Sequence, residues 1–575
     1  MTDHSRTGRV SRRTFISLVA AATTVPLLQA CGGQAPATTA TAAPAAATAA
    51  PASAATAAPK PATSAPAAAA ATTAPAAATA APAAATAAPP QATTAPAAAT
   101  AAPAAAGKPF AGTTIRYAGL TSMGQSLVQY TKDWLDDQGI TVQLSAYDQQ
   151  GLPQKIVEAA ATHTYLADLV QLGPNESIAL KSQGYLDEVP ASVLSQLSMD
   201  EVLPIFSRLL GYNGKIYALP YDGDDHMMAF RGDLFSNPDN QAKFKAKYGY
   251  DMDPVQGPKD WVEHGNYAEF FTGTNWNNSG QNDAFGFSHM TKRGDTLFWG
   301  FFSRAAAYAK HPDDPGFFFD TKTFKPRINS PAFVRAANEW RDECNKWSPP
   351  GGATQAGWGD VIQSYVTGRT AMCVGWGDHG TNAQDETTSV IKGKSRYAMT
   401  PGSKEVYNSS SGQWETLPQV SRAPYIAYGG WNLQMPKDSK QKEAAWAWGT
   451  YCASLPISNR MVTLPTGANP LRKSQLSDVK IWTDGPAKWD KDEAASYMKA
   501  IQDTITHPNL VADLRISGFF QYVEPLELAV SQVMAGQADA QKALDDAADA
   551  WTQITNKFGA DKQKALYLDA LGVGG

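Results

Sequence analysis

Beyond its first hundred or so residues, the chain alternates between the hydrophobic pattern of strands and that of helices. Thr114–Tyr117, Ile140–Tyr147 and Asp168–Leu172 have the apolar or alternating pattern typical of strands. Apolar residues at helical spacing over 127–135 and 153–161 predict the helices between them. Strands and helices in turn predict a mostly parallel sheet with helical crossovers, an α/β fold.

Two loops of this region are predicted to lie at one edge of the sheet. Ligands of such sheets bind beyond the carboxyl ends of the strands, which places Gly119–Gln125 and Gly173–Glu176 at a binding edge. Asn175 has two interpretations, a cap for the helix that begins here or a contact to a ligand, and the sequence leaves both open.

A second region is rich in predicted helices. Ser330 is expected to cap a helix with Pro331 in its first turn. Its apolar face comprises Phe333, Ala336, Ala337, Trp340, Cys344 and Trp347. Trp358–Thr367 is expected to be a helix that Gly368 ends, before a strand over Thr370–Val374. Lys442–Cys452 and 524–558, interrupted at Gly536, predict helices that cover the sheets.

The stretch AMCVGWGDHG after residue 370 contains a G-x-G-x-x-G spacing. A dinucleotide-binding loop continues into an amphipathic helix, but Thr381–Ser395 is polar and lacks an apolar face. We therefore interpret the spacing as a coincidence. The stretch does supply Trp376, Asp378 and His379 at the end of a strand.

Composition excludes several classes of function. The formal net charge is -5 over 575 residues, and no run of Lys and Arg follows the first thirteen residues, so nucleic acid is not an expected partner. Motifs for nucleoside triphosphates, zinc proteases, serine hydrolases and EF-hand calcium are absent from the sequence. We expect neither a cofactor nor a metal.

The acidic cluster from Tyr221 to His226 has three interpretations. It contains Asp222, Asp224 and Asp225, but its glycine stands in the wrong place for a calcium loop. A plain turn is one alternative to a cation site. The other is a cleft rim whose carboxylates accept hydrogen bonds from ligand hydroxyl groups.

The first 33 residues predict an export signal. Arginines precede a short apolar run, Phe15–Leu28, as in a secretory signal, and Ser11–Ile16 resembles a twin-arginine signal. Leu28–Cys31 resembles a bacterial lipobox, which makes Cys31 the expected lipid attachment site. Ordinary cleavage, with Cys31 lost or idle, is the alternative. Lipidation would hold the protein at the outer face of the cytoplasmic membrane.

Residues 34–107 repeat variants of TAAPAAA and predict a disordered linker. Prolines every few residues remove amide donors and disfavour a continuous helix. Such a linker suits a protein tethered to a membrane or cell wall.

Three cysteines remain besides Cys31, an odd number without a C-x-x-C pair. This pattern argues against a disulfide framework or a zinc site. Cys344 lies on the apolar helix face and is expected to be a small buried hydrophobic residue.

Several segments resemble the extracellular solute-binding proteins of ABC importers, the sugar-binding group that includes maltose-binding proteins. These segments span 108–575 in order: GYNGKIYALPYDGDDHMMAFRGDLF, VIQSYVTGRTAMCVGW, YGGWNLQMPKDSKQKEAAWAWGTYCAS, LPTGANPLRKS and MAGQADAQKALDDAADAW. The resemblance implies a type II periplasmic-binding-protein-like fold, in which two α/β lobes close around a solute and deliver it to a membrane permease.

By this resemblance the first lobe comprises about 108–228 and 425–474, and the second about 229–424 and 475–575. The chain would cross between lobes near 227–231 and return near 425–431.

The resemblance also implies candidate ligand-binding residues. Trp376 takes the place of an aromatic residue that stacks on sugar, Gly430 and Trp431 lie at the hinge and cleft, and Phe519 or Phe520 matches a second stacking position. Sugars need flat rings for their C–H faces and polar groups for their hydroxyl edges. Tyr221 beside Asp222 and Asp224 supplies that pairing, as Trp376 does beside Asp378 and His379.

We expect a monomeric, exported, lipid-anchored binding protein for a small polar solute, most simply a sugar or oligosaccharide, and not an enzyme. The alternative is an exported carbohydrate-active enzyme, which needs two carboxylates across a cleft, and Asp222 and Asp378 would be the candidates. A surface sensor or adhesin on the same fold is a third interpretation.

Overall fold

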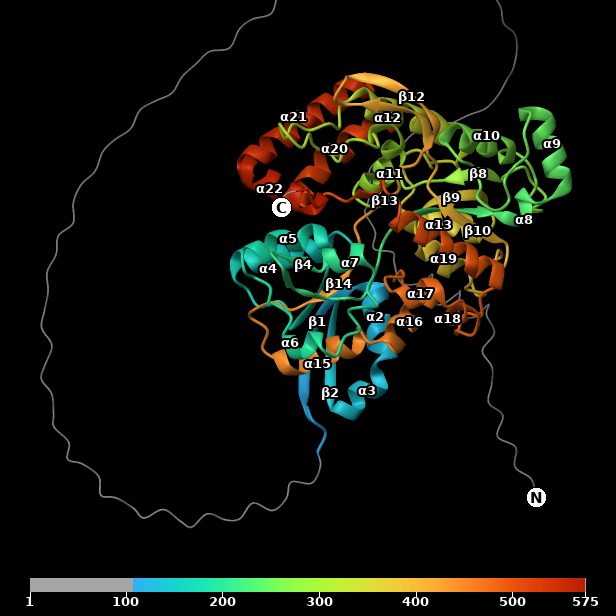
Figure 1. The fold of residues 1–575 in the computed structure, drawn as a ribbon. Helices are drawn as coiled ribbons and strands as arrows, with labels where there is room; N and C mark the ends of the chain where they lie inside the picture. Colours follow the sequence, from blue (N-terminus) through green and yellow to red (C-terminus); the bar gives the residue numbers. More distant parts are fainter. Residues whose placement is uncertain (1–106, 574–575) are drawn as a thin grey trace, which may run out of the picture. The chain divides into compact units, whose positions relative to one another are not determined.

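The computed structural model describes residues 107–573, which lie within one compact unit spanning Ala99–Gly575 (Figure 1). The predicted export signal, nearly all of the linker and Cys31 lie outside the described residues.

The first sheet has five strands in the order β2-β1-β3-β14-β6. They are β1 (Thr113–Leu120), β2 (Ile140–Tyr147), β3 (Leu169–Leu172), β6 (Ala218–Leu219) and β14 (Asn432–Gln434). β1 is parallel to β2 and β3, as the strand and helix alternation predicts. β14 enters from more than 200 residues later in the sequence and is antiparallel to both of its neighbours, β3 and β6.

Helices pack around the first sheet. They are α2 (Thr121–Tyr130), α3 (Lys132–Gln138), α4 (Gly151–Thr162), α5 (Pro174–Ser182), α6 (Ala191–Leu194), α7 (Pro204–Leu209), α15 (Lys442–Cys452) and α16 (Leu455–Thr463). A short hairpin joins β4 (Gly211–Tyr212) to β5 (Lys215–Ile216). The three strands and the helices that the sequence predicts up to position 182 are thus confirmed, as is the helix at 442–452.

The second sheet has four strands in the order β10-β7-β9-β8. They are β7 (His226–Arg231), β8 (Phe285–Ser288), β9 (Thr370–Trp376) and β10 (Ser395–Met399). Only β8 and β9 pair in parallel, whereas β7 is antiparallel to both of its neighbours. Three of its four strands, β8, β9 and β10, thus run in the same direction, as expected of a mostly parallel sheet. The exception is β7, which enters directly from the first sheet without a helical crossover.

A larger set of helices surrounds the second sheet. They are α8 (Gly232–Phe235), α9 (Pro238–Tyr248), α10 (Trp261–Phe271), α11 (Leu297–Ala309), α12 (Pro331–Trp347), α13 (Trp358–Val366), α14 (Asp378–Ala383), α17 (Lys473–Ser477), α18 (Lys480–Thr483) and α19 (Lys491–Ile505). Ser330 is the N-cap residue of α12, and the predicted face is buried except for Trp347, which is half-buried. A hairpin of β11 (Ser403–Asn408) and β12 (Gln413–Ser421) contacts α11 and α12.

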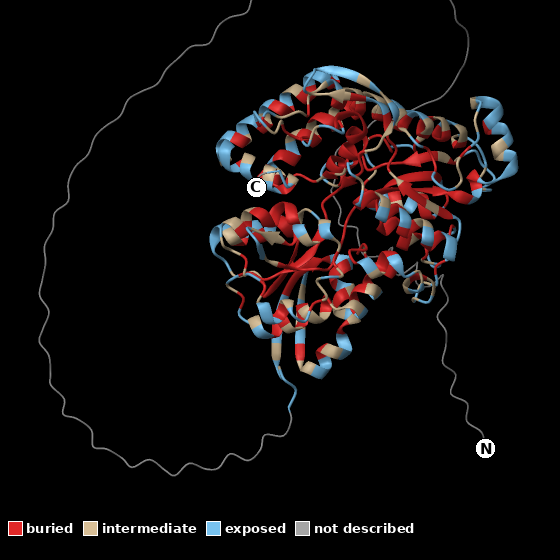
Figure 2. Ribbon diagram, viewed as in Figure 1, coloured by how far each residue is buried: buried red, intermediate tan, exposed pale blue. Residues whose placement is uncertain are grey.

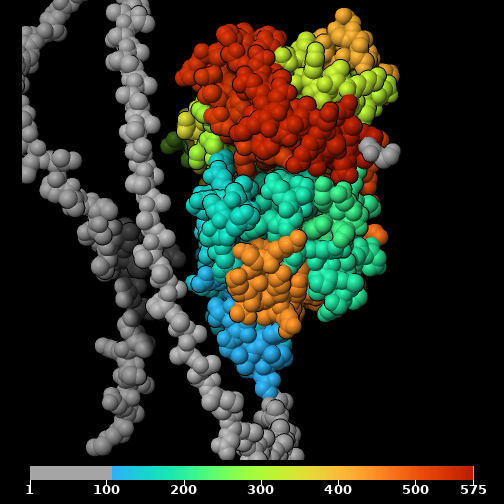
Figure 3. Space-filling view, turned by 90° about the vertical axis from the view of Figure 1, so that its left-hand side faces the viewer, coloured from blue at the N-terminus to red at the C-terminus, as the bar shows by residue number. Residues whose placement is uncertain are grey.

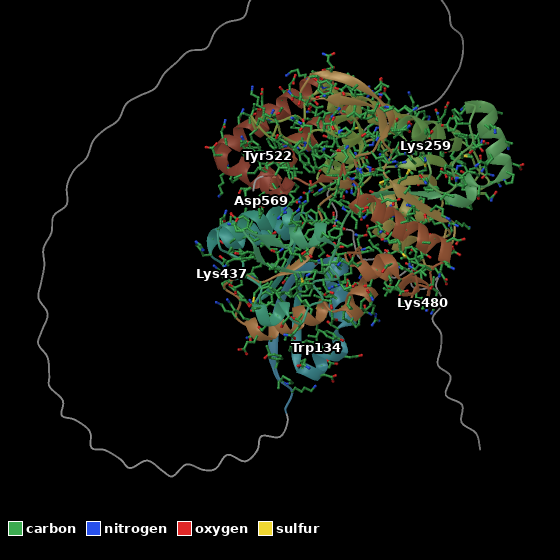
Figure 4. All side chains as sticks on the ribbon, viewed as in Figure 1. Trp134, Lys259, Lys437, Lys480, Tyr522 and Asp569 are labelled. Atoms are coloured by element: carbon green, nitrogen blue, oxygen red, sulfur yellow. The ribbon has the colours of Figure 1, made fainter. Side chains whose placement is uncertain are left out.

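The C-terminal helices are α20 (Phe519–Met534), α21 (Ala540–Phe558) and α22 (Ala560–Leu571). α20 packs on α11, α12 and α21, and it also contacts α5 beside the first sheet. Figure 3 shows the C-terminal helices, in red, lying against the teal surface of the helices around the first sheet. Asp569, in α22, lies at this boundary in Figure 4. The C-terminal helices thus lie between the helices that pack around the first sheet and those that surround the second.

The chain passes between the two sheets three times. The first passage lies between β6 and β7, a few residues before the predicted position, and the second lies between β13 (Tyr425–Ile426) and β14. The third follows α16 and leads into α17. β13 pairs in parallel with β15 (Val511–Ala512), so a later segment joins the same crossing region. The lobe limits that the resemblance implies remain a prediction.

Most strands of the two sheets lie in the buried interior, shown in red in Figure 2, whereas the edge strand β2 is mostly exposed or half-buried. Cys344, Cys373 and Cys452 are buried and unpaired. This confirms the interpretation of Cys344 as a small core residue. Among residues 107–573, no helix has the length and apolar character needed to cross a membrane.

Candidate ligand-binding site

A cavity of about 290 Å³ lies where the carboxyl ends of strands from both sheets meet the crossing segments. On the first-sheet side its wall contains Leu120 at the end of β1, Ser122 and Met123 from α2, and Gln149. The segment 465–467 completes this side. The loop 119–125, predicted to lie at a binding edge, thus contributes three residues to the wall.

The second-sheet side supplies α11, α13, the end of β9 and α14. Asp224 and Tyr428, from two different crossing segments, lie between the two sides. A ligand in this cavity would therefore touch both halves of the unit and the segments that join them.

A larger hollow of about 700 Å³ lies elsewhere, between β10, α8 and α19. Its wall comes only from elements around the second sheet and contains one aromatic residue, Tyr397. The smaller cavity joins both sheets and is rich in aromatic rings, which are the features of a small-molecule site, and we consider it the candidate site.

Five aromatic side chains line the cavity and contact one another in sequence. They are Trp358, Trp376, Trp299, Tyr428 and Trp431. Successive ring centroids lie 5.6, 5.8, 5.8 and 4.5 Å apart. The corresponding interplanar angles are 77°, 60°, 85° and 42°, so the rings are tilted against one another and do not form one flat stack.

Hydrogen bonds to the protein hold most of these rings in place. The Trp299 indole N–H donates to Asp513 Oδ2 at 2.8 Å, and the Trp376 indole N–H donates to the Ala427 carbonyl at 3.0 Å. The Trp358 indole N–H donates to both carboxylate oxygens of Asp378, at 3.1 and 3.0 Å. Because these polar edges already have partners, the rings offer mainly their faces to the cavity.

Two carboxyl groups complete the wall, Asp224 and Asp378. Burial, helped by the negative charge of the nearby Asp222 and opposed by the hydrogen bond from Trp358, raises the pKa of Asp378 to about 7. Burial also raises the pKa of Asp224 well above its usual range, helped by the negative charges of Asp222 and Asp378. Asp224 Oδ1 accepts a 2.6 Å hydrogen bond from Asn469 Nδ2.

Asp222 lies behind the wall and ties the three crossing segments together. Its carboxylate accepts from the backbone N–H of Trp431 at 2.9 Å and of Asn469 at 2.6 Å. The Asp222 carbonyl lies so close to Gly430 that an added Cβ there would be 2.1 Å from it, and Gly430 has φ +99°. Glycine is therefore required at position 430 for this close approach.

Comparison with known proteins identifies the family. A sequence profile described as bacterial extracellular solute-binding protein matches residues 125–489, more than half of the chain. The chain belongs to this family.

Among curated proteins, a mannitol-binding protein of Pseudomonas aeruginosa is 22% identical over 307 residues. That match covers 53% of this chain and 61% of the relative, so the chain spans less than two thirds of the length of that protein.

Solved structures share the fold. An ABC transporter solute-binding protein of Agrobacterium radiobacter K84 in complex with ribitol has a TM-score of 0.62 at 23% identity, covering 78% of this chain and 100% of its own. One from Agrobacterium vitis S4 with bound D-mannitol has a TM-score of 0.58 at 20% identity, covering 78% and 99%. Maltose-bound T. maritima MalE3 has a TM-score of 0.59 at 19% identity, covering 77% and 100%.

The predicted site residues of this solute-binding protein divide into those at the cavity and those outside its wall. Four of them line the same cavity although they come from β9, α14 and two crossing segments: Trp376, Asp378, Trp431 and Asp224. Gly430 and Asp222 lie directly behind it. The structure thus brings Trp376 and Trp431 to a shared cavity, as the sequence interpretation requires.

The remaining predicted residues lie outside the cavity wall. Asn175 is fully buried and donates through Nδ2 to Asp513 Oδ2 at 2.6 Å, and it does not cap its helix. Tyr221 and His379 are fully buried, and burial lowers the pKa of His379 to about 3. Phe520 is half-buried on α20, whereas its neighbour Phe519 contacts Trp299 at 6.2 Å between centroids.

Sequence reasoning missed three of the five rings. Trp299 lies in α11, which is buried at every position and so has no apolar face to distinguish it. Trp358 was expected only as the first residue of a helix. Tyr428 has φ +68°, rare for a residue with a side chain, and its place before two glycines was a signal that could have found it.

Residues 107–573 contain no group of three or more His, Cys, Asp or Glu side chains placed to hold a metal ion. Within the acidic cluster, Asp222 and Asp224 accept hydrogen bonds from amide donors.

Proposed function

We propose that this solute-binding protein captures a small polyhydroxylated solute, a sugar or sugar alcohol, and delivers it to the membrane subunits of an ABC importer. The observation that carries the proposal is a cavity lined from the sides of both sheets, in which five aromatic rings lie together with carboxyl and amide groups. Ring faces suit the C–H faces of such solutes, and the polar groups suit their hydroxyl edges.

The size of the cavity favours a single sugar or linear sugar alcohol over a long oligosaccharide. Its volume of about 290 Å³ lies at the lower end of the range of about 300–1,000 Å³ for small-molecule sites. Ribitol and mannitol in the related structures, and the mannitol-binding relative, support the same solute class.

We also propose that the protein acts by binding alone. The two cavity carboxyl groups already have partners, since Asp378 accepts from the Trp358 indole and Asp224 from the Asn469 amide. The family to which the chain belongs is one of solute-binding proteins. Incubation with oligosaccharides should give no product, and turnover of any of them would favour the alternative of an exported carbohydrate-active enzyme.

A thermal-shift screen across sugars and sugar alcohols tests the proposal. A solute that binds only the folded state must raise the melting temperature. We expect ribitol, mannitol or a monosaccharide to do so, whereas no shift with any member of the panel would contradict the proposal.

We propose further that export and lipidation at Cys31 place the protein at the outer face of the cytoplasmic membrane, with residues 34–107 as a tether. A monomer would suffice for this role, because one chain supplies both sides of the cavity.

A further inference from the structure

The cavity wall carries acidic side chains without any basic side chain to pair with them. Asp224 and Asp378 line the cavity, whereas no Lys, Arg or His does within residues 107–573. Behind them lie the buried Asp222 and Asp225. None of these four aspartates forms an ion pair with a basic side chain of the described part of the chain.

The partners of these aspartates are neutral groups. Asp222 and Asp224 accept from amide N–H groups, and Asp378 accepts from the Trp358 indole. Both carboxyl oxygens of Asp225 lack a hydrogen-bond partner among the described residues. Removal from water makes ionised carboxyl groups costly, and mutual repulsion adds to that cost, so a cation nearby would stabilise them.

The aromatic rings favour the same kind of ligand. Cations bind to the faces of Trp and Tyr rings, and cages of several rings recognise organic ammonium groups. Here the indole N–H groups of Trp299, Trp358 and Trp376 point to protein acceptors. The Tyr428 hydroxyl is likewise engaged, since it accepts from the Gly173 N–H at 3.1 Å and donates to Glu176.

We infer that the solute carries a positively charged nitrogen, as amino sugars and amino-substituted sugar alcohols do, and that Asp224, Asp378 and the ring faces receive it. This inference rests on the proposed function, since it assigns a chemical subclass to the solute of the same cavity. Neutral sugars and sugar alcohols lack a charge that would stabilise the ionised form of these buried carboxyl groups, so they should bind more weakly than their amine counterparts.

Matched pairs of solutes test this inference by calorimetric titration of the purified full chain near neutral pH. The pairs are sorbitol with N-methylglucamine and glucose with glucosamine, and choline serves as a cation without a sugar chain. We expect the amine of at least one pair to bind about tenfold or more tightly than its neutral partner.

Two variants make the test specific. Asp378→Asn should reduce the preference for the amine to about twofold or less while the neutral partner still binds. Glu386→Gln is the control, since Glu386 is 76% exposed and lies outside the cavity wall, and it should keep the preference. If Asp378→Asn fails to fold, Asp224→Asn replaces it with the same expected result.

The outcomes separate this inference from the proposed function. Equal or tighter binding of the neutral member in every pair overturns the inference and leaves the proposed function in place. Binding of choline alone supports a cationic ligand but contradicts a polyhydroxylated one, and binding of no probe overturns both.

Discussion

At the scale of single residues, Trp376 provides the most direct test of the cavity. Its ring contacts those of Trp299 and Trp358, and it is 6% exposed. We expect Trp376→Ala to weaken solute binding by more than about 1 kcal/mol, the scale of one lost stacking contact. Calorimetric titration with the solute that raises the melting temperature measures the loss.

The matched control is Trp414→Ala on β12, because Trp414 is 37% exposed and lies outside the cavity wall. Unchanged affinity in a folded Trp376→Ala variant would remove Trp376 from the site.

Glu176 should make stability depend on pH. Burial raises the pKa of its carboxyl group from the ordinary value of 4.5 to about 8. The folded protein therefore keeps a proton that the unfolded chain releases, and the contribution to stability falls as pH rises from about 4.5 to about 8. The amide of Glu176→Gln stays uncharged, so the free energy of unfolding of this variant should fall less over this pH range. The fall should be smaller than that of the wild type by at least about 1 kcal/mol.

Urea titrations at the two ends of this pH range measure the difference. Glu386→Gln, at an exposed carboxylate, should follow the wild type. The assignment would be wrong if Glu176→Gln lost as much stability with rising pH as the wild type does.

At the scale of elements, the crossing segments depend on close backbone approach. Gly430 combines φ +99° with a carbonyl that an added Cβ would meet at 2.1 Å. We expect Gly430→Ala to reduce the free energy of unfolding by roughly 1–3 kcal/mol from the backbone conformation alone, and by more once the clash is included.

Gly359→Ala is the control for this variant, because Gly359 lies in α13, is exposed and has no atom within 4 Å of the added Cβ. Its stability should stay the same or rise by about 0.5–1 kcal/mol. Equal stability of the two variants in urea denaturation would show that the close approach at Gly430 is not required.

Elements with a clear local pattern could be predicted from the sequence. The helix at Lys442–Cys452 has the predicted bounds, and the strand that begins at Thr370 runs two residues further than expected. Local pattern could not reveal β14, since three residues in the middle of the first sheet owe their position to partners more than 200 residues away.

The candidate site was predicted only in part for a similar reason. Residues beside glycines at the ends of strands, such as Trp376 and Trp431, carry a recognisable signal. Asn175 shows the limit of that signal, because a polar residue at the predicted edge is held by Asp513, whose position only the fold determines.

At the scale of the whole molecule, a solute that contacts both sides of the cavity should draw them together. We expect energy transfer between dyes at Lys437→Cys, beside the first sheet, and Lys259→Cys, beside the second, to increase when solute binds (Figure 4). The labelled protein also carries Cys31→Ser, so that Cys31 cannot react with the dyes. Because Cys344, Cys373 and Cys452 are buried, the two new cysteines are the accessible thiols within residues 107–573.

Dyes at Lys259→Cys and Lys480→Cys, both beside the second sheet, form the control pair and should show no change. A saturating solute that leaves both pairs unchanged would rule out closure.

Anchoring is also a property of the whole chain. If Cys31 carries the lipid, Cys31→Ser should move the protein from the membrane fraction to the soluble fraction or the medium. Immunoblotting of the fractions measures this, with the three buried cysteines left intact. A variant that remains with the membrane would contradict lipidation at this residue.

The position of β14 between β3 and β6 has a consequence for biosynthesis. β6 ends at residue 219, but the strand that joins it to the sheet is complete only at residue 434. At about 5–20 residues per second, a ribosome needs roughly 10–40 s to make the intervening chain. During that time the nascent first sheet lacks the strand that joins β6 to β3, so β3 emerges from the ribosome with an unpaired edge.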